Sequence, residues 1–383
     1  MTLRTATLRT AVKKPITLIA GFGVWASAAA NAQITPGGIS MQPANSALAE
    51  EVHIFHNWIL MPVMTGISAL ILGLLIWIVL RYNSKANPTP SKFSHNTLIE
   101  IIWTGVPVLI LLAIALPSFD LLYKEDVTPD GQQVVATGDG QTVDFIFAND
   151  FPESRMVRRP KHLQVIIDNG TERRVLKNRA DYRVDGFGKT DLVVSLTTPP
   201  AAGERVIIRG GRSVDHRGNV TLAPTMTLKV TGYQWGWNYA YPDFGDFEYL
   251  SNLLPKDQTT PELYLRAVDN RVVVPVGETV RVTITARDVI HSWALPAFAI
   301  KLDAVPGRIN ETWIKADREG VYYGQCSEIC GIKHAFMPIA VEVVSRPAFE
   351  AWVDSQRALA GMDPLFDADT VKLAQGDASA LSE

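Results

Sequence analysis

Two long apolar stretches interrupt the first third of an otherwise mixed sequence. Residues 57–80 contain no charged side chain, and neither do residues 101–119. About 20 apolar residues are enough to cross the hydrocarbon core of a bilayer. The pattern therefore predicts two transmembrane helices, at about residues 57–80 and 98–122, within an N-terminal segment that covers residues 33–123.

Charge in the connecting loop predicts the direction of these helices. The loop carries Arg81, Lys85 and Lys92 and no acidic residue. Loops of this kind stay on the cytoplasmic side. The N-terminus and everything after Leu122 are therefore expected on the opposite, periplasmic side.

The first residues have the three zones of a secretory signal. A basic start without acids is followed by an apolar stretch at residues 16–30, and Ala30-Asn31-Ala32 fits the small-x-small cleavage rule. We expect a signal peptide over residues 1–32, cut after Ala32. A retained amphipathic anchor is the alternative.

Beyond the second helix, short segments rich in Val, Ile and Thr alternate with turn residues. Between residues 226 and 346 this spacing predicts an all-β sandwich or barrel. The expected strands of this domain lie at residues 226–231, 262–267, 271–276, 280–286 and 339–344.

The preceding segment, residues 124–225, is also β-rich and has no catalytic motif. Its expected strands lie at residues 142–147, 163–168, 192–196 and 205–209. Residues 129–225 contain 14 basic and 12 acidic side chains. This near balance favours a solvated surface over an anion-binding patch.

The C-terminal segment, residues 347–383, begins with an amphipathic pattern. Phe349, Trp352, Val353 and Leu359 recur at helical spacing after Pro347 and predict one helix. Residues beyond 363 are expected to be loosely ordered.

Acidic charge is concentrated in the last part of the chain. The chain has a net charge of -3, which becomes about -7 without the signal peptide. Residues 226–383 contain 14 basic and 21 acidic residues. This balance disfavours nucleic acid as a partner and would steer a basic protein towards the surface.

Metal-binding side chains are concentrated in the stretch from His291 to Met337. His291 is followed after 34 residues by Cys326, Cys330, His334 and Met337. Thiolate, imidazole and a weak Met ligand are typical of copper electron-transfer sites, whereas structural zinc normally has four Cys or His ligands. A single blue-copper ion needs one cysteine, but two cysteines can bridge two coppers. A disulfide, a single zinc and a redox thiol pair are the competing interpretations.

Glu100 stands at the start of the second predicted helix, one residue before its uncharged run. A carboxylate in the first turn is stabilised by the helix dipole. An ionisable group at a membrane boundary can also collect protons. The sequence leaves both interpretations open.

Several segments resemble the cytochrome c oxidase subunit II family, whose members carry a dinuclear CuA centre. The similarity extends over about residues 50–125 and 226–355 and implies a cupredoxin-like copper domain. Residues 129–225 have no counterpart in the family's usual short link, so we interpret them as an inserted β-rich module. The similar segments are residues 288–295, 303–308 and 322–331 of the copper signature, the aromatic segment 232–239, and residues 100–104 and 115–118 of the second membrane helix.

The resemblance implies a ligand set residue by residue. Glu328 would contribute twice, with its backbone carbonyl on copper and its carboxylate on a magnesium ion shared with subunit I. The implied copper ligands are the bridging Cys326 and Cys330, His291 and Met337 on one copper, and His334 and the Glu328 carbonyl on the other.

The implied function is electron relay in the inner membrane of a bacterium. Cytochrome c would deliver electrons at Trp235, and the haem-bearing subunit I, beside subunit III, would reduce O2 and pump protons. Glu100 would lie at the mouth of a proton pathway. The activity belongs to the complex rather than to this chain alone. The implied docking acids for cytochrome c are Asp243, Asp246, Glu248, Asp269, Asp288 and Asp303.

Related copper proteins remain as alternatives. A nitrous oxide reductase would need a propeller domain, and a quinol oxidase subunit would lack the ligands. A copper-dependent nitric oxide reductase subunit is harder to separate, although Trp235 with Glu100 favours oxygen reduction. A membrane-anchored copper carrier would need exposed, exchangeable ligands. Gly236 stands where the family often has an aromatic residue, which leaves the shape of the electron entry patch open.

Overall fold

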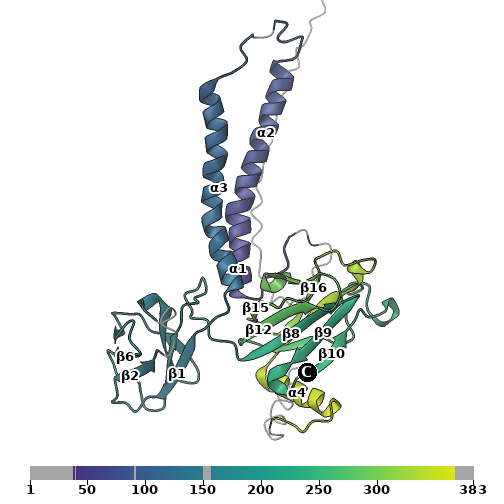
Figure 1. The fold of residues 1–383 in the computed structure, drawn as a ribbon. Helices are drawn as coiled ribbons and strands as arrows, with labels where there is room; N and C mark the ends of the chain where they lie inside the picture. Colours follow the sequence, from purple (N-terminus) through teal and green to yellow (C-terminus); the bar gives the residue numbers. More distant parts are fainter. Residues whose placement is uncertain (1–37, 39, 90–91, 150–156, 367–383) are drawn as a thin grey trace, which may run out of the picture. The chain divides into compact units, whose positions relative to one another are not determined.

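The computed structural model describes residues 38, 40–89, 92–149 and 157–366. The predicted signal peptide lies outside these residues, as does most of the predicted C-terminal tail. The described chain consists of a helical hairpin and two β-rich regions (Figure 1).

The predicted transmembrane hairpin is confirmed. Helix α1 (Ala47–Ile54), the π-helical segment η1 (Phe55–Leu60) and α2 (Met61–Arg81) form one continuous run, and α3 (Thr97–Asp126) is the second. Both runs are long and apolar enough to cross a membrane, and neither α2 nor α3 has a buried residue. The hairpin is therefore built to be covered by lipid or by other membrane proteins.

Both helical runs extend beyond the uncharged stretches because polar residues cap them. Ser46 Oγ accepts a hydrogen bond from Ala49 N at 3.0 Å and starts α1. Asn96 Oδ1 accepts from Leu98 N at 3.1 Å and from Ile99 N at 3.2 Å and starts α3. Such caps satisfy the free N–H groups of a first helical turn.

The first β-rich region follows α3 and contains two sheets, with strand orders β1-β7-β3-β4 and β2-β6-β5. Buried side chains from both sheets share one core, which includes Phe147, Val165, Leu192 and Ile208. The region therefore has a hydrophobic core of its own. Its strands are β1 (Gln132–Thr137), β2 (Asp144–Ala148), β3 (Leu163–Asp168), β4 (Arg173–Val175), β5 (Tyr182–Asp185), β6 (Asp191–Leu196) and β7 (Arg205–Gly210).

The second β-rich region is a sandwich of two five-stranded sheets, ordered β10-β9-β8-β12-β15 and β11-β17-β16-β13-β14. One core, with Trp237, Trp293 and Ile284 fully buried, fills the space between the sheets. The predicted all-β, cupredoxin-like domain is confirmed. Its strands are β8 (Met226–Tyr233), β9 (Gly236–Tyr241), β10 (Phe247–Ser251), β11 (Val272–Pro275), β12 (Thr279–Ala286), β13 (His291–Leu295), β14 (Ile300–Ala304), β15 (Asn310–Lys315), β16 (Gly320–Cys326) and β17 (Pro338–Val344).

The predicted strand at residues 262–267 is wrong, because this segment folds into consecutive turns. Leu263 N donates to Thr260 O at 3.1 Å, and Ala267 N donates to Leu263 O at 2.9 Å. Leu265 has a positive φ of 70°. These backbone groups are bonded within the segment and are not available to a sheet ladder.

The predicted C-terminal helix is present as α4 (Arg346–Leu359). Phe349 and Val353 are buried, and Trp352 packs edge-on against Tyr241 with ring centroids 5.0 Å apart. Leu359, which was expected on the apolar face, is 82 % exposed at the end of the helix. The helix therefore packs through its first two turns.

Candidate metal centre

The sheet that contains β13 and β16 brings the candidate ligands together. His291 is the first residue of β13, and Cys326 is the last residue of β16. These strands pair antiparallel, with Trp293 opposite Cys326. Cys330, His334 and Met337 lie in the chain between β16 and β17, so the turn after β16 returns them to the same place.

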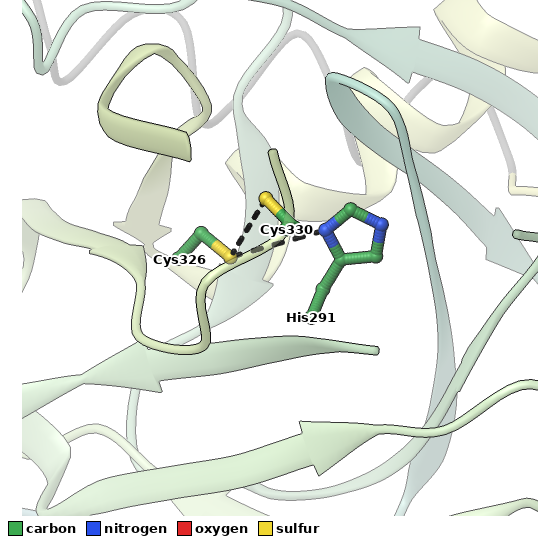
Figure 2. A group of neighbouring side chains, drawn as sticks. All are labelled: His291, Cys326 and Cys330. Atoms are coloured by element: carbon green, nitrogen blue, oxygen red, sulfur yellow. Dashed lines mark hydrogen bonds between the residues drawn. The ribbon is translucent and has the colours of Figure 1, made fainter. Parts of the chain in front are cut away.

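The two thiols lie at the centre of the cluster (Figure 2). Cys326 Sγ is 3.9 Å from both Cys330 Sγ and His291 Nδ1. Cys330 Sγ lies 3.6 Å from His334 Nδ1 and 3.4 Å from Met337 Sδ. The Glu328 carbonyl oxygen is 3.4 Å from Cys326 Sγ. Every copper ligand predicted from the sequence thus belongs to one cluster.

The donor set fits a soft metal ion. Both cysteines are free, and their 3.9 Å separation is far above the 2.03–2.05 Å of a disulfide bond. A thiolate–metal distance of roughly 2.3 Å allows two sulfurs at this separation to bind the same ion. His291, Cys326, Cys330 and Met337 are buried, and His334 is half-buried. Buried thiols, imidazoles and a thioether suit copper, and they lack the exposure that a metal carrier requires.

The two thiols differ in how easily they lose their protons. Burial is the largest influence on Cys326 and opposes its ionisation, but hydrogen bonds to His291, to the backbone of Glu328 and Ser292 and to His334 together lower the pKa of that thiol. Burial and the adjacent Cys326 raise the pKa of Cys330. Metal ligation requires both thiols to be deprotonated. A cation between the two sulfurs would remove the repulsion between the thiolates that disfavours ionisation of Cys330.

Asp288 holds the His291 ring in its orientation. Its Oδ1 lies 3.0 Å from His291 Nε2, while His291 Nδ1 faces Cys326. A carboxylate on one ring nitrogen fixes the tautomer that presents the other nitrogen to a metal. A Cβ at Gly232 would lie 2.8 Å from His291 Cδ2, so glycine is needed for the ring to fit. From the sequence, Asp288 was predicted as a docking acid and as part of the similar segment 288–295 but not as a partner of His291, although its three-residue spacing from His291 was a usable signal.

The Asp288→Asn variant is therefore expected to bind copper about 10- to 100-fold more weakly, as is typical when such a supporting carboxylate is lost. Competition with a copper chelator on the purified chain measures this affinity. Asp303→Asn is the matched control, because Asp303 is exposed and its side chain makes no hydrogen bond within the described residues. Equal affinity of the two variants would contradict the positioning role.

Trp235 lies directly beside the cluster. Its Nε1 donates to the Cys330 carbonyl at 3.2 Å, and Gln234 Nε2 donates to the same oxygen at 2.7 Å. The ring is half-buried, and the Lys333 ammonium lies 5.7 Å from its centroid. A partly exposed indole is thus hydrogen-bonded to the backbone of a metal-ligand residue. Gln234 is a contact that the sequence analysis missed.

The other predicted site residues lie apart from the cluster core or serve local structure. The exposed Glu328 side chain has no hydrogen bond or ion pair within the described residues. Glu100 lies in the first turn of α3, and its Oε1 accepts a hydrogen bond from Asn96 N at 3.3 Å, a local contact that was not predicted. Its proton-pathway role stays a prediction.

The six candidate docking acids are exposed on the copper domain. Several of them also make hydrogen bonds or ion pairs within the domain. Asp243 accepts from Thr227 N at 2.5 Å, and Asp269 accepts from Asn252 N at 2.7 Å. Glu248 accepts from Asn238 Nδ2 at 2.9 Å, and Asp246 lies 3.6 Å from Lys229 Nζ. Their role in docking stays a prediction.

A two-helix membrane anchor joined to a cupredoxin-like sandwich with buried thiols and an imidazole defines a membrane-anchored protein of the cupredoxin-like class. Family models described as the transmembrane and periplasmic domains of cytochrome c oxidase subunit II match residues 34–121 and 226–344. The chain belongs to the cytochrome c oxidase subunit II family of haem–copper oxidases. Residues 122–225 lie between the two matched ranges.

Two relatives agree with this assignment in sequence. A probable cytochrome c oxidase subunit 2 from Rickettsia bellii is 35% identical over 91% of this chain and 95% of its own length. Cytochrome c oxidase subunit 2 from Cereibacter sphaeroides is 30% identical over 84% of this chain and 81% of its own. The solved periplasmic domain of subunit II from Bradyrhizobium japonicum is 52% identical, with a TM-score of 0.34, and the match covers 35% of this chain and 95% of that domain.

Proposed function

We propose that this chain accepts electrons from cytochrome c at a dinuclear CuA centre and passes them to the haem-containing subunit I. The observation that carries the proposal is the pair of buried, unbonded thiols, 3.9 Å apart, with an imidazole beside each. Cys326 and Cys330 would bridge two coppers. When bound, the copper pair supplies a one-electron redox couple whose charge is shared between two ions.

The protein's own residues fix the positions of the ligands and exclude water from the site. The β13–β16 pairing fixes His291 relative to Cys326, and Asp288 fixes the ring. Burial excludes water from the sulfurs, which limits rearrangement when the charge changes. His291 with Met337 and His334 with the Glu328 carbonyl are the proposed terminal pairs. Each thiolate would bind both coppers. The distance from one sulfur to an imidazole or thioether therefore does not decide which copper that ligand would bind.

The wider assignments are part of the same proposal. The chain would cross a bacterial inner membrane twice, with both termini in the periplasm and subunits I and III as neighbours. Glu328 would hold a magnesium ion shared with subunit I, and Glu100 would stand at the mouth of a proton pathway. The exposed carboxylates of the copper domain would attract the lysines of cytochrome c.

Copper counting with electron paramagnetic resonance on the full-length chain tests the centre. We expect two coppers per chain and a mixed-valence signal split by both nuclei. One copper with a four-line signal, or zinc in its place, would contradict the dinuclear assignment.

Trp235→Phe tests the electron entry route. The change keeps an aromatic ring but removes the Nε1–H donor to the Cys330 carbonyl. We expect unchanged copper content and a loss of about tenfold or more in the rate of cytochrome c oxidation by the assembled oxidase. Tyr264→Phe is the control, because Tyr264 lies in the turn segment and not at the cluster. A wild-type rate in Trp235→Phe would exclude this route.

A further inference from the structure

A cavity of about 740 Å³ lies where α3 ends, away from the metal cluster. Its lining comes from α3 (Tyr123, Lys124), from α1 (Glu51), from the first β-rich region (Lys161, His162) and from β15 (Lys315). The volume is within the range of ordinary ligand pockets. The nearly balanced charge of residues 129–225 predicted a solvated surface rather than an anion-binding patch in this part of the chain.

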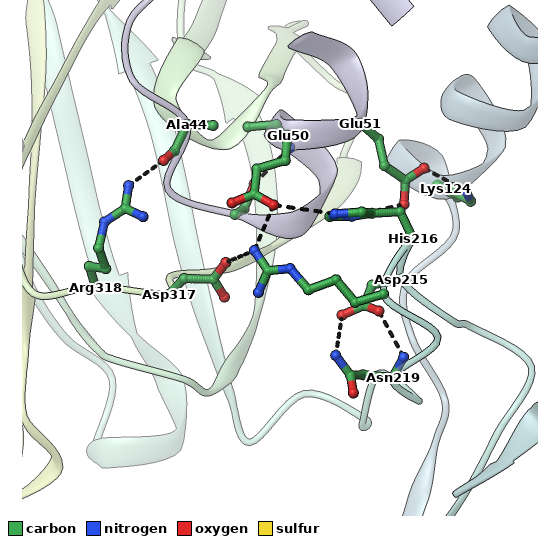
Figure 3. Close-up of polar contacts among 12 residues, drawn as sticks. Ala44, Glu50, Glu51, Lys124, Asp215, His216, Asn219, Asp317 and Arg318 are labelled. Carbon is green, nitrogen blue, oxygen red and sulfur yellow. Dashed lines mark hydrogen bonds and ion pairs between the residues drawn. The ribbon is translucent and has the colours of Figure 1, made fainter. Parts of the chain in front are cut away.

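The carboxylates around the cavity already have hydrogen-bond or ion-pair partners, and Figure 3 shows those of Glu51, Asp215 and Asp317. Glu51 and Asp120 lie 2.6 Å and 2.8 Å from Lys124 Nζ. Asp317 pairs with Arg217 at 3.4 Å, and Asp215 accepts from the backbone and side chain of Asn219. The remaining lining carboxylate and guanidinium, Asp130 and Arg212, also have partners.

Three basic side chains of the cavity differ from these acids. Within the described chain, the side chains of Lys161, His162 and Lys315 make no hydrogen bond or ion pair. His162 and Lys315 are also half-buried. Partly buried basic groups without a direct hydrogen-bond or ion-pair partner are costly, and an anion between them would offset that cost.

The electrostatics agree with this geometry. Burial, followed by the nearby charges of Lys161, Arg212 and Arg159, lowers the pKa of His162. Burial and the Arg209 guanidinium lower the pKa of Lys315, although Asp317 and Asp215 act in the opposite direction. Burial is thus the main cause for both groups, and His162 lies among like charges whereas Lys315 has charges of both signs nearby.

We propose that this cavity binds a phosphate group, held by Lys161, His162 and Lys315. Lysine binds phosphate as a point charge, and a neutral imidazole can donate from one ring nitrogen. The phosphate can come from an anionic lipid headgroup or from free phosphate. The membrane-spanning helix α3 contributes Tyr123 and Lys124 to the wall, which puts the cavity at headgroup level.

The exposed apolar end of α3 favours a lipid as the source. Leu116, Phe119 and Leu122 are all more than half exposed within the last turns before the cavity. Acyl chains packed along these side chains would leave their headgroup beside the basic residues. A soluble anion would use only the polar part of this surface.

The test uses the full-length chain, delipidated in a neutral detergent. Three probes are added separately: dioleoyl phosphatidylglycerol, dioleoylglycerol without phosphate, and inorganic phosphate. Native mass spectrometry measures bound lipid, and thermal unfolding measures the effect of each probe. The test variant is Lys161→Gln with Lys315→Gln. The control is Lys177→Gln with Lys301→Gln, which removes two exposed lysines from the same two β-rich regions.

We expect the test variant to bind phosphatidylglycerol at least about tenfold more weakly than the wild type, and the control to bind it normally. The same pattern with inorganic phosphate alone would support the phosphate site and assign free phosphate as its source. Equal binding by test and control variants, or equal binding of dioleoylglycerol, would overturn the proposal. If the double variant unfolds, Lys161→Gln is tested alone, because Lys161 is exposed and its replacement does not disturb the core. We expect this single variant to bind phosphatidylglycerol more weakly than the wild type, by less than the double variant.

Discussion

Replacing Cys330 by serine is expected to reduce bound copper from the proposed two ions per chain to one or none. Cys330 Sγ lies 3.6 Å from His334 Nδ1 and 3.4 Å from Met337 Sδ, so the change removes a thiolate from the centre of the ligand cluster. A serine hydroxyl stays protonated at neutral pH and is a hard ligand that suits copper poorly. Elemental analysis of the full-length chain, together with electron paramagnetic resonance, measures the change.

Met337→Leu is the matched comparison for this loss. Leucine has nearly the volume of methionine and keeps the buried packing, but it removes the thioether. We expect this variant to retain two coppers with an altered spectrum. If Cys330→Ser also retained two coppers and a mixed-valence signal, the bridging role of its sulfur would be refuted.

Gly324→Ala is expected to unfold the copper domain far more readily than the wild type. A Cβ at Gly324 in β16 would lie 1.9 Å from the Ala294 carbonyl oxygen and 3.0 Å from its carbon. The clash is with the backbone of β13, which cannot relieve it by rotating as a side chain could. Strand β13 also contains His291. We expect a loss of about 3 kcal/mol or more in the free energy of unfolding. A decrease of roughly 10 °C in Tm would correspond to it.

Gly277→Ala separates crowding from backbone conformation in this measurement. Gly277 has a φ of 75°, and a Cβ there meets nothing within 4 Å. The change therefore costs only the left-handed conformation, about 1–2 kcal/mol. Thermal unfolding of both copper-free variants compares the effects. Equal decreases in Tm would show that the strands accommodate a methyl group at Gly324.

The membrane hairpin could be predicted because its signal is local. The lengths of the uncharged runs at 57–80 and 101–119 decide whether the segments can cross a bilayer, and no distant contact changes this. The helix ends were less accurate. The cap at Ser46 starts the first helical run at Ala47 rather than at about residue 57, and α3 continues to Asp126 rather than to about residue 122.

The strands were predicted less completely because sheet pairing is not local. Strands β13 and β16 were not anticipated, although together they fix His291 and Cys326. The segment 262–267 has the composition of a strand, but its backbone is bonded within turns. Composition shows that a segment can pair, whereas the available partner decides whether it does.

The sequence by itself determined the class of the fold, the membrane hairpin and the residue types of the metal cluster. The spacing of Cys326, Cys330, His334 and Met337 places four donors in one loop. Only the tertiary structure decided how His291, separated from Cys326 by 34 intervening residues, reaches that loop. It also decided that Asp288 orients this ring and that Trp235 and Gln234 hold the Cys330 carbonyl. These contacts depend on strand register and on packing between distant segments, which no local pattern of residues encodes.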